Sequence, residues 1–363
     1  MAVQWSRVVN TTIRQFIRER EVNSLRNRKI PALLQKKGRI SYNSSGTQMD
    51  WKVQYKRAPM VAFQGGDTLE FARRDRWKTA TLGWRGYSTT DSIEKSEFLA
   101  NRGKEAIINV YSEIAKLLMD DIEDQWAEEF YVDGTATGNE KRMHGIESFL
   151  SNSGAVAGNG NATPSATYAG LSCVPGNYGG TWGTTAGTDA WPLGKGSSHY
   201  DFWSPIIIDY SNTLFSATAT WAANAISAIA YGIIKSQKSK SAKGMLDVIF
   251  LEDELYRVYV DLLRAKERLT VNKTADAGLL TSLGFTNVVS QDGVEITWEY
   301  GTPAAVGYGL NIDEMELKSQ QGQLFVPEGP DFDISTKSWR FSIDMFGNIK
   351  WNPKFQCKFI KVT

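Results

Sequence analysis

The sequence predicts an α+β fold with at least two subdomains, and three observations carry this prediction. Apolar and polar residues alternate over residues 38–90 and again over 324–362, as they do in strands with one solvated face. An apolar stripe at helical spacing predicts one long helix over residues 91–133. From residue 205 onward, helical patterns alternate with short buried strands. Elements in this order are typical of α+β proteins.

The composition is that of a folded protein rather than a disordered one. The chain has 363 residues, of which 42% are hydrophobic and 22% charged, and its twelve tryptophans hint at extensive protein–protein contact. It has two cysteines, Cys173 and Cys357, which match no metal or redox spacing, and two histidines. We therefore expect a reducing cytoplasm, no metal and no cofactor. We also expect no secretory signal, because no apolar run follows a basic N-terminal start.

Charge is divided unevenly along the chain, although the net charge is only +1. Residues 1–90 carry a net charge of +12, and residues 91–363 carry −11. The division fits a basic arm on an acidic domain, or a basic end of one copy that lies on the acidic body of the next. A third interpretation is an arm that binds nucleic acid.

The first ninety residues predict an arm followed by a β-ribbon. Residues 1–37 have the pattern of a basic arm with a short helix that stops before Pro31. Residues 38–90 alternate as extended chain, with a turn at 65–67. Because a lone two-stranded hairpin is marginally stable in water, the ribbon needs a partner surface.

The helix over 91–133 is the most strongly patterned element. Its apolar stripe includes Ile107, Leu118 and Trp126, and capping side chains are available at 90–92. Its far end is crowded with acids, which is unfavourable to the helix dipole and favours a cationic partner. These acids are Asp120, Asp121, Glu123, Asp124, Glu128 and Glu129.

The second half begins with a segment rich in Gly, Ser and Thr. We interpret residues 151–204 as a surface loop or insertion rather than a ligand-binding excursion. The uncharged stretch 214–234 is long enough for a membrane, but its polar residues and helical spacing favour a buried helix over 217–235. A buried strand over 246–251 and a helix over 252–268 follow.

No residue pattern indicates catalysis. His144 follows two basic residues in a turn and His199 ends a Gly/Ser loop, so both are interpreted as surface or packing residues. The metalloprotease, phosphate-loop, nucleophile-elbow and dinucleotide motifs are absent from the sequence. The best acid pair, Asp120 with Glu123 or Asp124, lies on a helix and is expected to be solvated or paired with arginines. We predict that the protein is not an enzyme.

Three stretches of sequence resemble a known family. They are residues 130–134 followed by 144–150, residues 247–251 followed by 255–259, and residues 307–313 together with 345–349. These motifs, and above all the order of the elements, resemble the Hong Kong 97-type major capsid fold of tailed bacteriophages.

The resemblance implies a division of the chain into five parts. They are an N-terminal arm at 1–37, an extended β-ribbon or E-loop at 38–90, a P-domain with its long spine helix at 91–144, an α/β A-domain at 145–318, and returning P-domain strands at 319–363.

The resemblance also gives the charge asymmetry a role. In such shells the E-loop lies across a neighbouring subunit, so Arg73, Arg74 and Arg76 are candidate contacts of a neighbour's acidic helix. The expected partners on that helix are Asp120, Asp121, Glu123, Asp124 and Glu128.

The implied function is that of a major capsid protein, which assembles in the host cytoplasm into the virion capsid. Pentamers and hexamers would form an icosahedral shell around double-stranded DNA, with a separate scaffolding protein and a portal; a decoration protein is left open, and no membrane is expected. An encapsulin compartment is the alternative of the same fold. A carbohydrate-binding module or glycosidase that uses Trp182 and Trp191 is the alternative of a different class, and a nucleic-acid-binding protein is the third.

Overall fold

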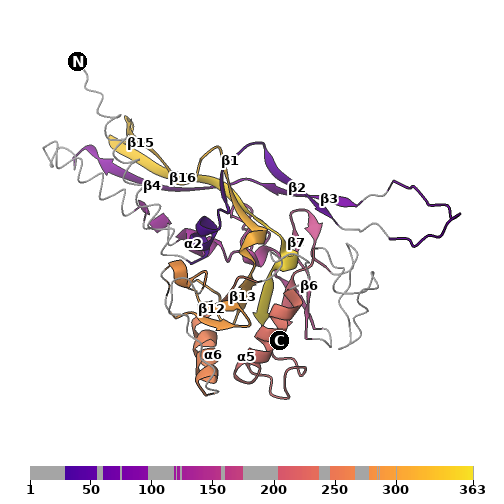
Figure 1. Cartoon of the computed structure of the whole chain (residues 1–363). Helices are drawn as coiled ribbons and strands as arrows, with labels where there is room; N and C mark the ends of the chain where they lie inside the picture. The colour runs from indigo at the N-terminus through magenta and orange to yellow at the C-terminus, as the bar shows by residue number, and fades with distance from the viewer. Residues whose placement is uncertain are drawn as a thin grey trace.

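The computed structural model of the chain describes a body of two larger sheets with two long projections (Figure 1). The described residues are 29–54, 60–73, 76–96, 118–119, 121–122, 125–156, 160–174, 203–236, 246–265, 278–283, 285, 287–299 and 301–362. Short 3-10 helices within them are η1 (Ile146–Ser148), η4 (Thr281–Leu283), η5 (Ile312–Glu314) and η6 (Pro353–Phe355).

A five-stranded sheet is built around one strand of fourteen residues, β16. Strand β4 pairs antiparallel along one edge of β16, while β14 and β15 share the opposite edge, and β1 pairs parallel with β14. The strands are β1 (Ile40–Ser44), β4 (Arg85–Glu94), β14 (Met315–Gln320), β15 (Val326–Asp333) and β16 (Ser338–Trp351). Strands from residues 40–94 therefore share one sheet with strands from residues 315–351.

The predicted start of the long helix is wrong. Residues 91–94 belong to strand β4, whose backbone pairs with β16 from Arg85 opposite Gly347 to Glu94 opposite Ser338. Apolar and polar residues continue to alternate as far as the buried Ile93, as in a strand. The strand that stabilises this segment, β16, lies about 250 residues away in sequence. Helical backbone is described at 95–96, directly after the strand, and at 118–119, 121–122 and 125–129, where Leu118 and Trp126 of the predicted stripe are buried.

The end of the predicted arm is also different from expectation. Helix α2 (Lys29–Lys36) contains Pro31 rather than stopping before it. Proline is tolerated there because the N–H groups of a first helical turn have no intrahelical partner. Ile30, Leu33 and Leu34 are buried in the main core, so residues 29–36 belong to the body of the protein. Residues 1–28 of the arm lie outside the described residues.

The second larger sheet has six strands and is buried on both faces. Its order is β11 (Val289–Gln291), β12 (Val294–Trp298), β10 (Val248–Leu251), β13 (Gly307–Leu310), β17 (Cys357–Ile360) and β9 (Ile206–Asp209). Ile249 and Leu251 pack in the cluster beneath helices α5 (Trp221–Ser236) and α6 (Asp253–Ala265), whereas Val248 and Phe250 face the main core. Because β17 joins this sheet, the expected returning strands are divided between the two larger sheets.

The uncharged stretch 214–234 forms a buried helix, as predicted, although α5 begins at Trp221 instead of residue 217. Its Gly232 allows close packing on the sheet, since a Cβ atom there would lie 2.7 Å from the ring of Phe359. In the part of the chain that the structure describes, the helices are too short or too polar to cross a bilayer.

The predicted surface loop at 151–204 is wrong for the portion that is described. Residues 152–172 contain two small hairpins, β5 (Asn152–Val156) with β6 (Ala162–Pro164) and β7 (Thr167–Tyr168) with β8 (Leu171–Ser172). Tyr168 is fully buried and donates a hydrogen bond to the carbonyl oxygen of Ile349 at 3.0 Å. Apolar residues spaced among glycines thus anchor this segment to the core. Residues 175–202 lie outside the described part.

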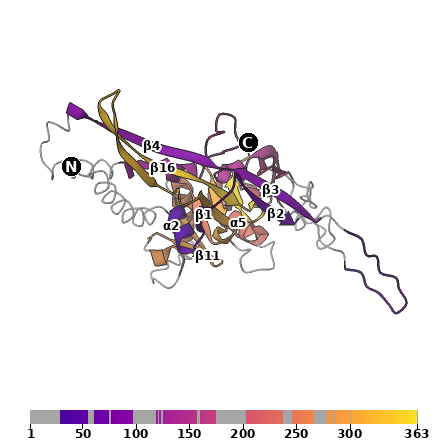
Figure 2. The same ribbon diagram turned by 90° about the horizontal axis from the view of Figure 1, so that it is seen from above.

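The β-ribbon is present but shorter than predicted. Strands β2 (Gln48–Gln54) and β3 (Trp77–Gly83) pair antiparallel, whereas β1 and β4 on either side belong to the five-stranded sheet. Figures 1 and 2 both show the ribbon leaving the body in the direction opposite to the far end of β4 and β16. The two projections therefore extend the molecule on opposite sides.

Candidate assembly surfaces

The base of the ribbon is fixed to the body by apolar side chains on one of its faces. All seven residues of β2 pair with β3, and Met49, Ala80 and Leu82 on the inner face are buried. The ring of Trp51 lies 6.4 Å from that of Trp203, centroid to centroid. The predicted need of the ribbon for a partner surface is thus met at its base by the body of the same chain.

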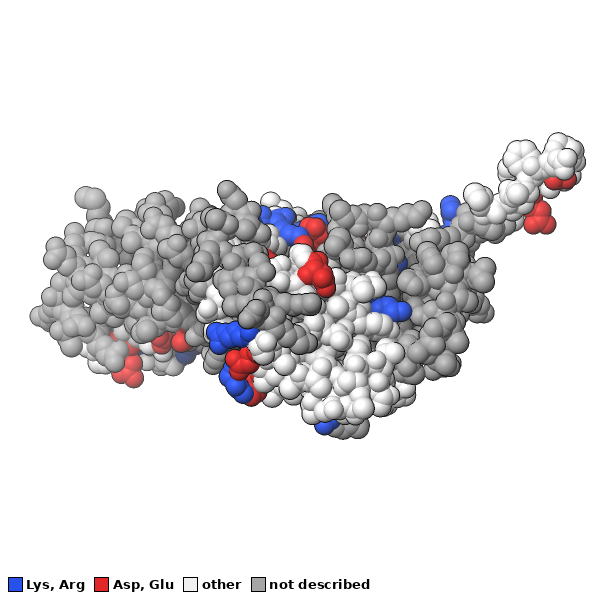
Figure 3. Space-filling view, turned by 60° about the horizontal axis from the view of Figure 1, so that its bottom comes forward, with Lys and Arg blue, Asp and Glu red and all other residues white. Residues whose placement is uncertain are grey.

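The tip of the ribbon has no such support. Residues 60–73 form no strand or helix, and their large apolar side chains stand in solvent: Met60 is 99% exposed, Phe71 95% and Phe63 69%. Figure 3 shows this end of the molecule as uncharged atoms with acidic side chains among them. Because soluble proteins rarely leave several large apolar side chains uncovered side by side, this tip has the character of a contact surface.

The predicted contact residues are exposed wherever the structure describes them. Arg73 is the last residue of the tip and Arg76 lies after it, and neither forms an ion pair with another described residue. Asp121 and Glu128 are exposed on the helix. The remaining predicted contacts, Arg74, Asp120, Glu123 and Asp124, lie outside the described residues. The structure does not join the arginines to the acids within one copy, and their pairing between copies stays a prediction.

One acid of the helix end has a different role from its neighbours. Glu129 is buried, and its carboxylate accepts hydrogen bonds from Nε of Arg142 at 3.1 Å and from the hydroxyl of Tyr87 at 2.6 Å. Burial and this carboxylate raise the pKa of Tyr87. The helix end, the turn at 142–143 and strand β4 are therefore tied together. Glu129 is one of the acids for which the sequence predicts a cationic partner, and Arg142 is such a partner. Its burial and its contact with Tyr87 could not be predicted, because Tyr87 is remote from it in sequence.

His144 is a packing residue, as predicted. Its ring Nδ1 lies 2.9 Å from Nδ2 of Asn348, which also donates to the carbonyl oxygen of Gly83 at 2.9 Å. Burial, together with the positive charge of Arg85, lowers the pKa of His144 to about 4. The imidazole is therefore neutral near pH 7, where it joins the base of the ribbon to β16.

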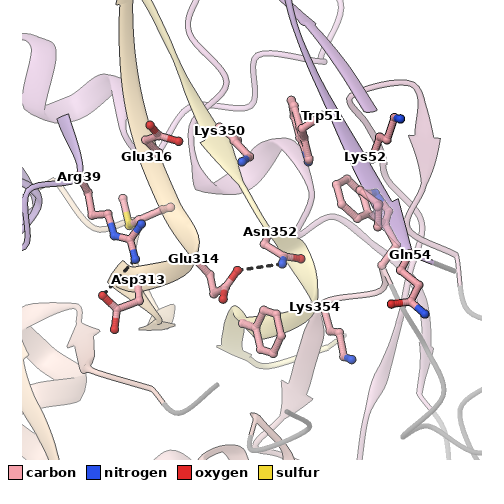
Figure 4. A pocket seen from close by; sticks show the side chains of 14 residues that line it. Arg39, Trp51, Lys52, Gln54, Asp313, Glu314, Glu316, Lys350, Asn352 and Lys354 are labelled. Atoms are coloured by element: carbon pink, nitrogen blue, oxygen red, sulfur yellow. Dashed lines mark hydrogen bonds and ion pairs between the residues drawn. The ribbon is translucent and has the colours of Figure 1, made fainter. Parts of the chain in front are cut away.

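A pocket of about 530 Å³ opens beside the base of the ribbon (Figure 4). Strand β2, the η5–β14 segment and the end of β16 with η6 line it, together with Arg39 and Trp203. Figure 4 shows Lys350 and Trp51 beside one another, and Arg39, Asp313 and Glu314 on the side of β14, from elements that are widely separated in sequence. Only the tertiary fold brings them together, so no local sequence signal marks this pocket.

The three acids of the pocket are already engaged. Asp313 pairs with Lys37 at 3.3 Å and with Arg39 at 3.4 Å, and Glu314 accepts a hydrogen bond from Asn352 at 3.0 Å. Glu316 lies 3.5 Å from the ammonium of Lys318. Two of these contacts appear as dashed lines in Figure 4.

Two lysines of the pocket are different from its acids. Among the described residues, Lys52 and Lys350 have no hydrogen-bond or ion-pair partner, and the ammonium of Lys350 lies 5.4 Å from the ring centroid of Trp51. Burial lowers the pKa of Lys350, an effect that Glu316 partly offsets. Lys350 therefore lies against the ring of Trp51 in the field of Glu316, whereas Lys52 is on the exposed face of β2.

The described residues contain no group of three His, Cys, Asp or Glu side chains placed to hold a metal ion. Cys173 and Cys357 are buried free thiols. His199 and the tryptophans of the carbohydrate-binding alternative, Trp182 and Trp191, lie outside the described part of the chain.

Comparison with solved structures identifies the fold. No protein-family model and no curated protein matches the chain. The cyanophage A-1(L) capsid asymmetric unit matches with a TM-score of 0.55 at 14% identity, covering 90% of each chain. The capsid of a native GTA particle matches with a TM-score of 0.51 at 11% identity, covering 92% of this chain and 90% of that one. The capsid of Myoviridae phage XM1 matches with a TM-score of 0.50 at 11% identity, covering 90% of this chain and 91% of that one. This chain has the mixed α and β fold of phage capsid proteins, as its sequence predicted.

Proposed function

We propose that this chain is the major capsid protein of a tailed bacteriophage, a shell subunit rather than an enzyme. The match to these capsid structures covers about nine-tenths of this chain and about nine-tenths of each matched chain. This coverage supports a whole shell subunit rather than a small domain inserted into another protein. The sequence and the described residues offer no competing catalytic constellation.

The observation that carries the proposal is the projecting ribbon with its uncovered apolar tip. Exposed side chains such as Phe63 and Phe71 contribute nothing to the core of their own copy. Contact with a second copy removes them from water, at roughly 25 cal/mol for each Å² of apolar area buried. A projecting segment of this kind suits a subunit that is completed by its neighbours.

The subdomains of the capsid fold are assigned in the same proposal. Residues 1–37 are the N-terminal arm and residues 38–90 the E-loop. The P-domain contains the spine helix within 91–144 and the strands returning in 319–363, and the A-domain spans 145–318. Five of the six strands in the sheet covered by α5 and α6 lie within 145–318, which supports the A-domain assignment; the sixth, β17, comes from the returning segment.

Assembly follows from many weak contacts per subunit, which become strong together once a shell is closed. We propose that pentamers and hexamers of the chain form an icosahedral shell around double-stranded DNA. A separate scaffolding protein and a portal would take part, assembly would take place in the host cytoplasm, and the virion capsid would be the final location.

The experiment is negative-stain electron microscopy of the protein purified after co-expression with its neighbouring genes, with light scattering on a sizing column beside it. Closed shells, or rings of five and six subunits, are expected. A monomer of 40.5 kDa under every assembly condition would overturn the proposal. Nuclease-protected DNA inside the shells is expected for a phage capsid, whereas an enzyme cargo would assign the shell to an encapsulin.

A further inference from the structure

The ribbon joins the five-stranded sheet at a corner of three residues. Strand β3 ends at Gly83 and β4 begins at Arg85, so the corner, residues 83–85, lies between the ribbon and the sheet (Figure 2). Trp84 donates from its ring Nε1 to a carbonyl oxygen in the turn between β1 and β2 at 2.8 Å. Arg85 donates from Nε to a carbonyl oxygen of the turn leading into η1 at 3.1 Å. The carbonyl oxygen of Gly83 is held by the buried side chain of Asn348, so each residue of the corner is tied to another segment.

The side-chain amide of Asn348 uses all of its hydrogen-bonding groups. Its Oδ1 accepts from the backbone N–H groups of His144 at 3.0 Å and of Ile349 at 2.9 Å. Its Nδ2 donates to the carbonyl oxygen of Gly83 at 2.9 Å and lies 2.9 Å from Nδ1 of the His144 ring. The two backbone donors fix the amide with its oxygen towards them. Both hydrogens of Nδ2 are therefore directed at Gly83 and His144.

This arrangement requires one form of the His144 ring. A ring nitrogen that faces an N–H group must accept, so Nδ1 carries no proton and the neutral imidazole has its proton on Nε2. A second proton, on Nδ1, would set N–H against N–H. The amide of Asn348 could not turn over in response without leaving two buried backbone N–H groups unpaired. The contact of Asn348 with Gly83 thus depends on the charge of one ring.

The surroundings of His144 keep that ring neutral at pH 7. Burial has the largest effect and Arg85 on β4 acts in the same direction, whereas Asp133 opposes them, and together they lower the pKa of His144 to about 4. From β7, the uncharged ring of Tyr168 stands edge-on at 6.0 Å, centroid to centroid. About half of the His144 rings are therefore charged at pH 4, and about one in a thousand at pH 7.

We propose that His144, Asn348 and Gly83 form an acid-sensitive latch that fixes the direction in which the ribbon leaves the body. Asn348 is the positioning residue, and the neutral ring of His144 holds its amide in place. Protonation of the ring withdraws the amide from Gly83 and loosens the corner. The bond from Trp84 and the apolar contacts of the ribbon base contain no titratable group and remain, so the ribbon gains freedom at the corner without leaving the body.

The consequence for assembly rests on the proposed function. A shell subunit whose ribbon is held in one direction meets its neighbours already ordered, whereas a loosened ribbon must be ordered during each contact. Because several copies must be latched for one ring to close, the effect of acid on assembly is multiplied over the copies. The latch itself belongs to the single subunit and can be measured without shells.

Hydrogen exchange of the unassembled subunit tests the latch. In His144→Asn the side-chain oxygen stands where Nδ1 was, so it accepts from Asn348 at every pH and does not titrate. The backbone amides of residues 82–86 are expected to exchange about fivefold faster in the unaltered protein than in His144→Asn at pH 4, and equally fast at pH 7. Comparison at one pH removes the intrinsic acid dependence of exchange. Strand β10, in the other large sheet, should exchange equally in both proteins.

Trp84→Phe is the matched control. It removes the hydrogen bond of the corner that involves no titratable group, so it should speed the exchange of residues 82–86 by the same factor at pH 7 and at pH 4. Equal exchange of the corner in the unaltered protein and in His144→Asn at pH 4 would overturn the latch. An acceleration that extends equally to β10 would also overturn it, because acid would then loosen the whole subunit.

Light scattering during assembly measures the consequence. At pH 4 the unaltered protein is expected to form shells at least about fivefold more slowly than His144→Asn, and at pH 7 at the same rate. Equal rates at pH 4 would overturn the link between latch and assembly. Absence of shells from both proteins at every pH would overturn the proposed function, while the exchange measurement would still decide the latch.

Discussion

The carboxylate of Glu129 and the guanidinium of Arg142 form an ion pair that fixes the helical residues 125–129 against the turn leading into η1. Glu129 is 9% exposed, and the same carboxylate accepts a hydrogen bond from Tyr87 of β4. One side chain thus holds three segments that meet at the base of the five-stranded sheet.

Glu129→Ala is therefore expected to lower the free energy of unfolding by about 2 kcal/mol, since it leaves Arg142 and Tyr87 without their shared partner. Urea unfolding of the unassembled subunit measures the change. Glu128→Ala, at the exposed neighbouring position, is the control and should stay within about 0.5 kcal/mol of the unaltered protein. Equal effects of the two substitutions would contradict the role given to Glu129.

His144 predicts a pH dependence of stability. Its pKa is about 4 in the folded state against an ordinary value of 6.5, so the unfolded chain binds a proton that the folded one does not. The contribution of neutral His144 to the free energy of unfolding is therefore fully present above about pH 6.5. It is lost as the pH drops towards 4, by a total on the order of 3 kcal/mol. His144→Gln should flatten that part of the profile, measured by urea unfolding at intervals from pH 7 to 4.5. An unchanged slope in the variant would assign the effect to carboxylates instead.

Because the apolar side chains of the tip lie in solvent, we expect substitutions there to impair assembly without affecting the folding of the subunit. Phe63→Ser and Phe71→Ser are expected to leave the melting temperature of the unassembled subunit unchanged, because both rings are already in solvent, and to reduce the yield of shells strongly. Ile334→Ser is a matched control, since Ile334 is 72% exposed on the projection at the other side. Light scattering during assembly gives the readout, and normal assembly of both tip variants would count against the ribbon as a contact.

The charge hypothesis makes a prediction of its own. Replacing Arg73 and Arg74 together by glutamate is expected to block assembly while leaving a folded subunit, because their proposed partners are the acids of a neighbour's helix. Arg264→Glu, an exposed change on α6, provides the control. Glu128→Arg in the same chain should recover part of the assembly. Normal shells from the double arginine variant would refute the pairing.

Much of the fold was predictable from the sequence because its signals are local. The buried strand at β10, the helices α5 and α6, and the alternating ribbon each depend on the spacing of apolar residues within one segment. The order of these elements was sufficient to predict a capsid-type fold, which the comparisons confirm.

The errors have a common physical cause. Residues 91–94 carry capping residues suited to a helix, yet they form a strand because β16 offers a complete row of backbone partners. Pro31 lies inside α2 because the apolar residues around it are buried against distant parts of the chain. Local propensity is weak enough for tertiary contacts to override it.

Some features of the candidate assembly surfaces could likewise be predicted from the sequence, and others required the tertiary structure. The sequence by itself determined that the ribbon carries positive charge near its tip and that the helix end carries negative charge, because charge is a property of composition. Only the tertiary structure decided that Glu129 is buried, that Phe63 and Phe71 are uncovered, and that Trp51 and Lys350 lie side by side in one pocket. Burial and proximity depend on partners tens or hundreds of residues away, which no local pattern encodes.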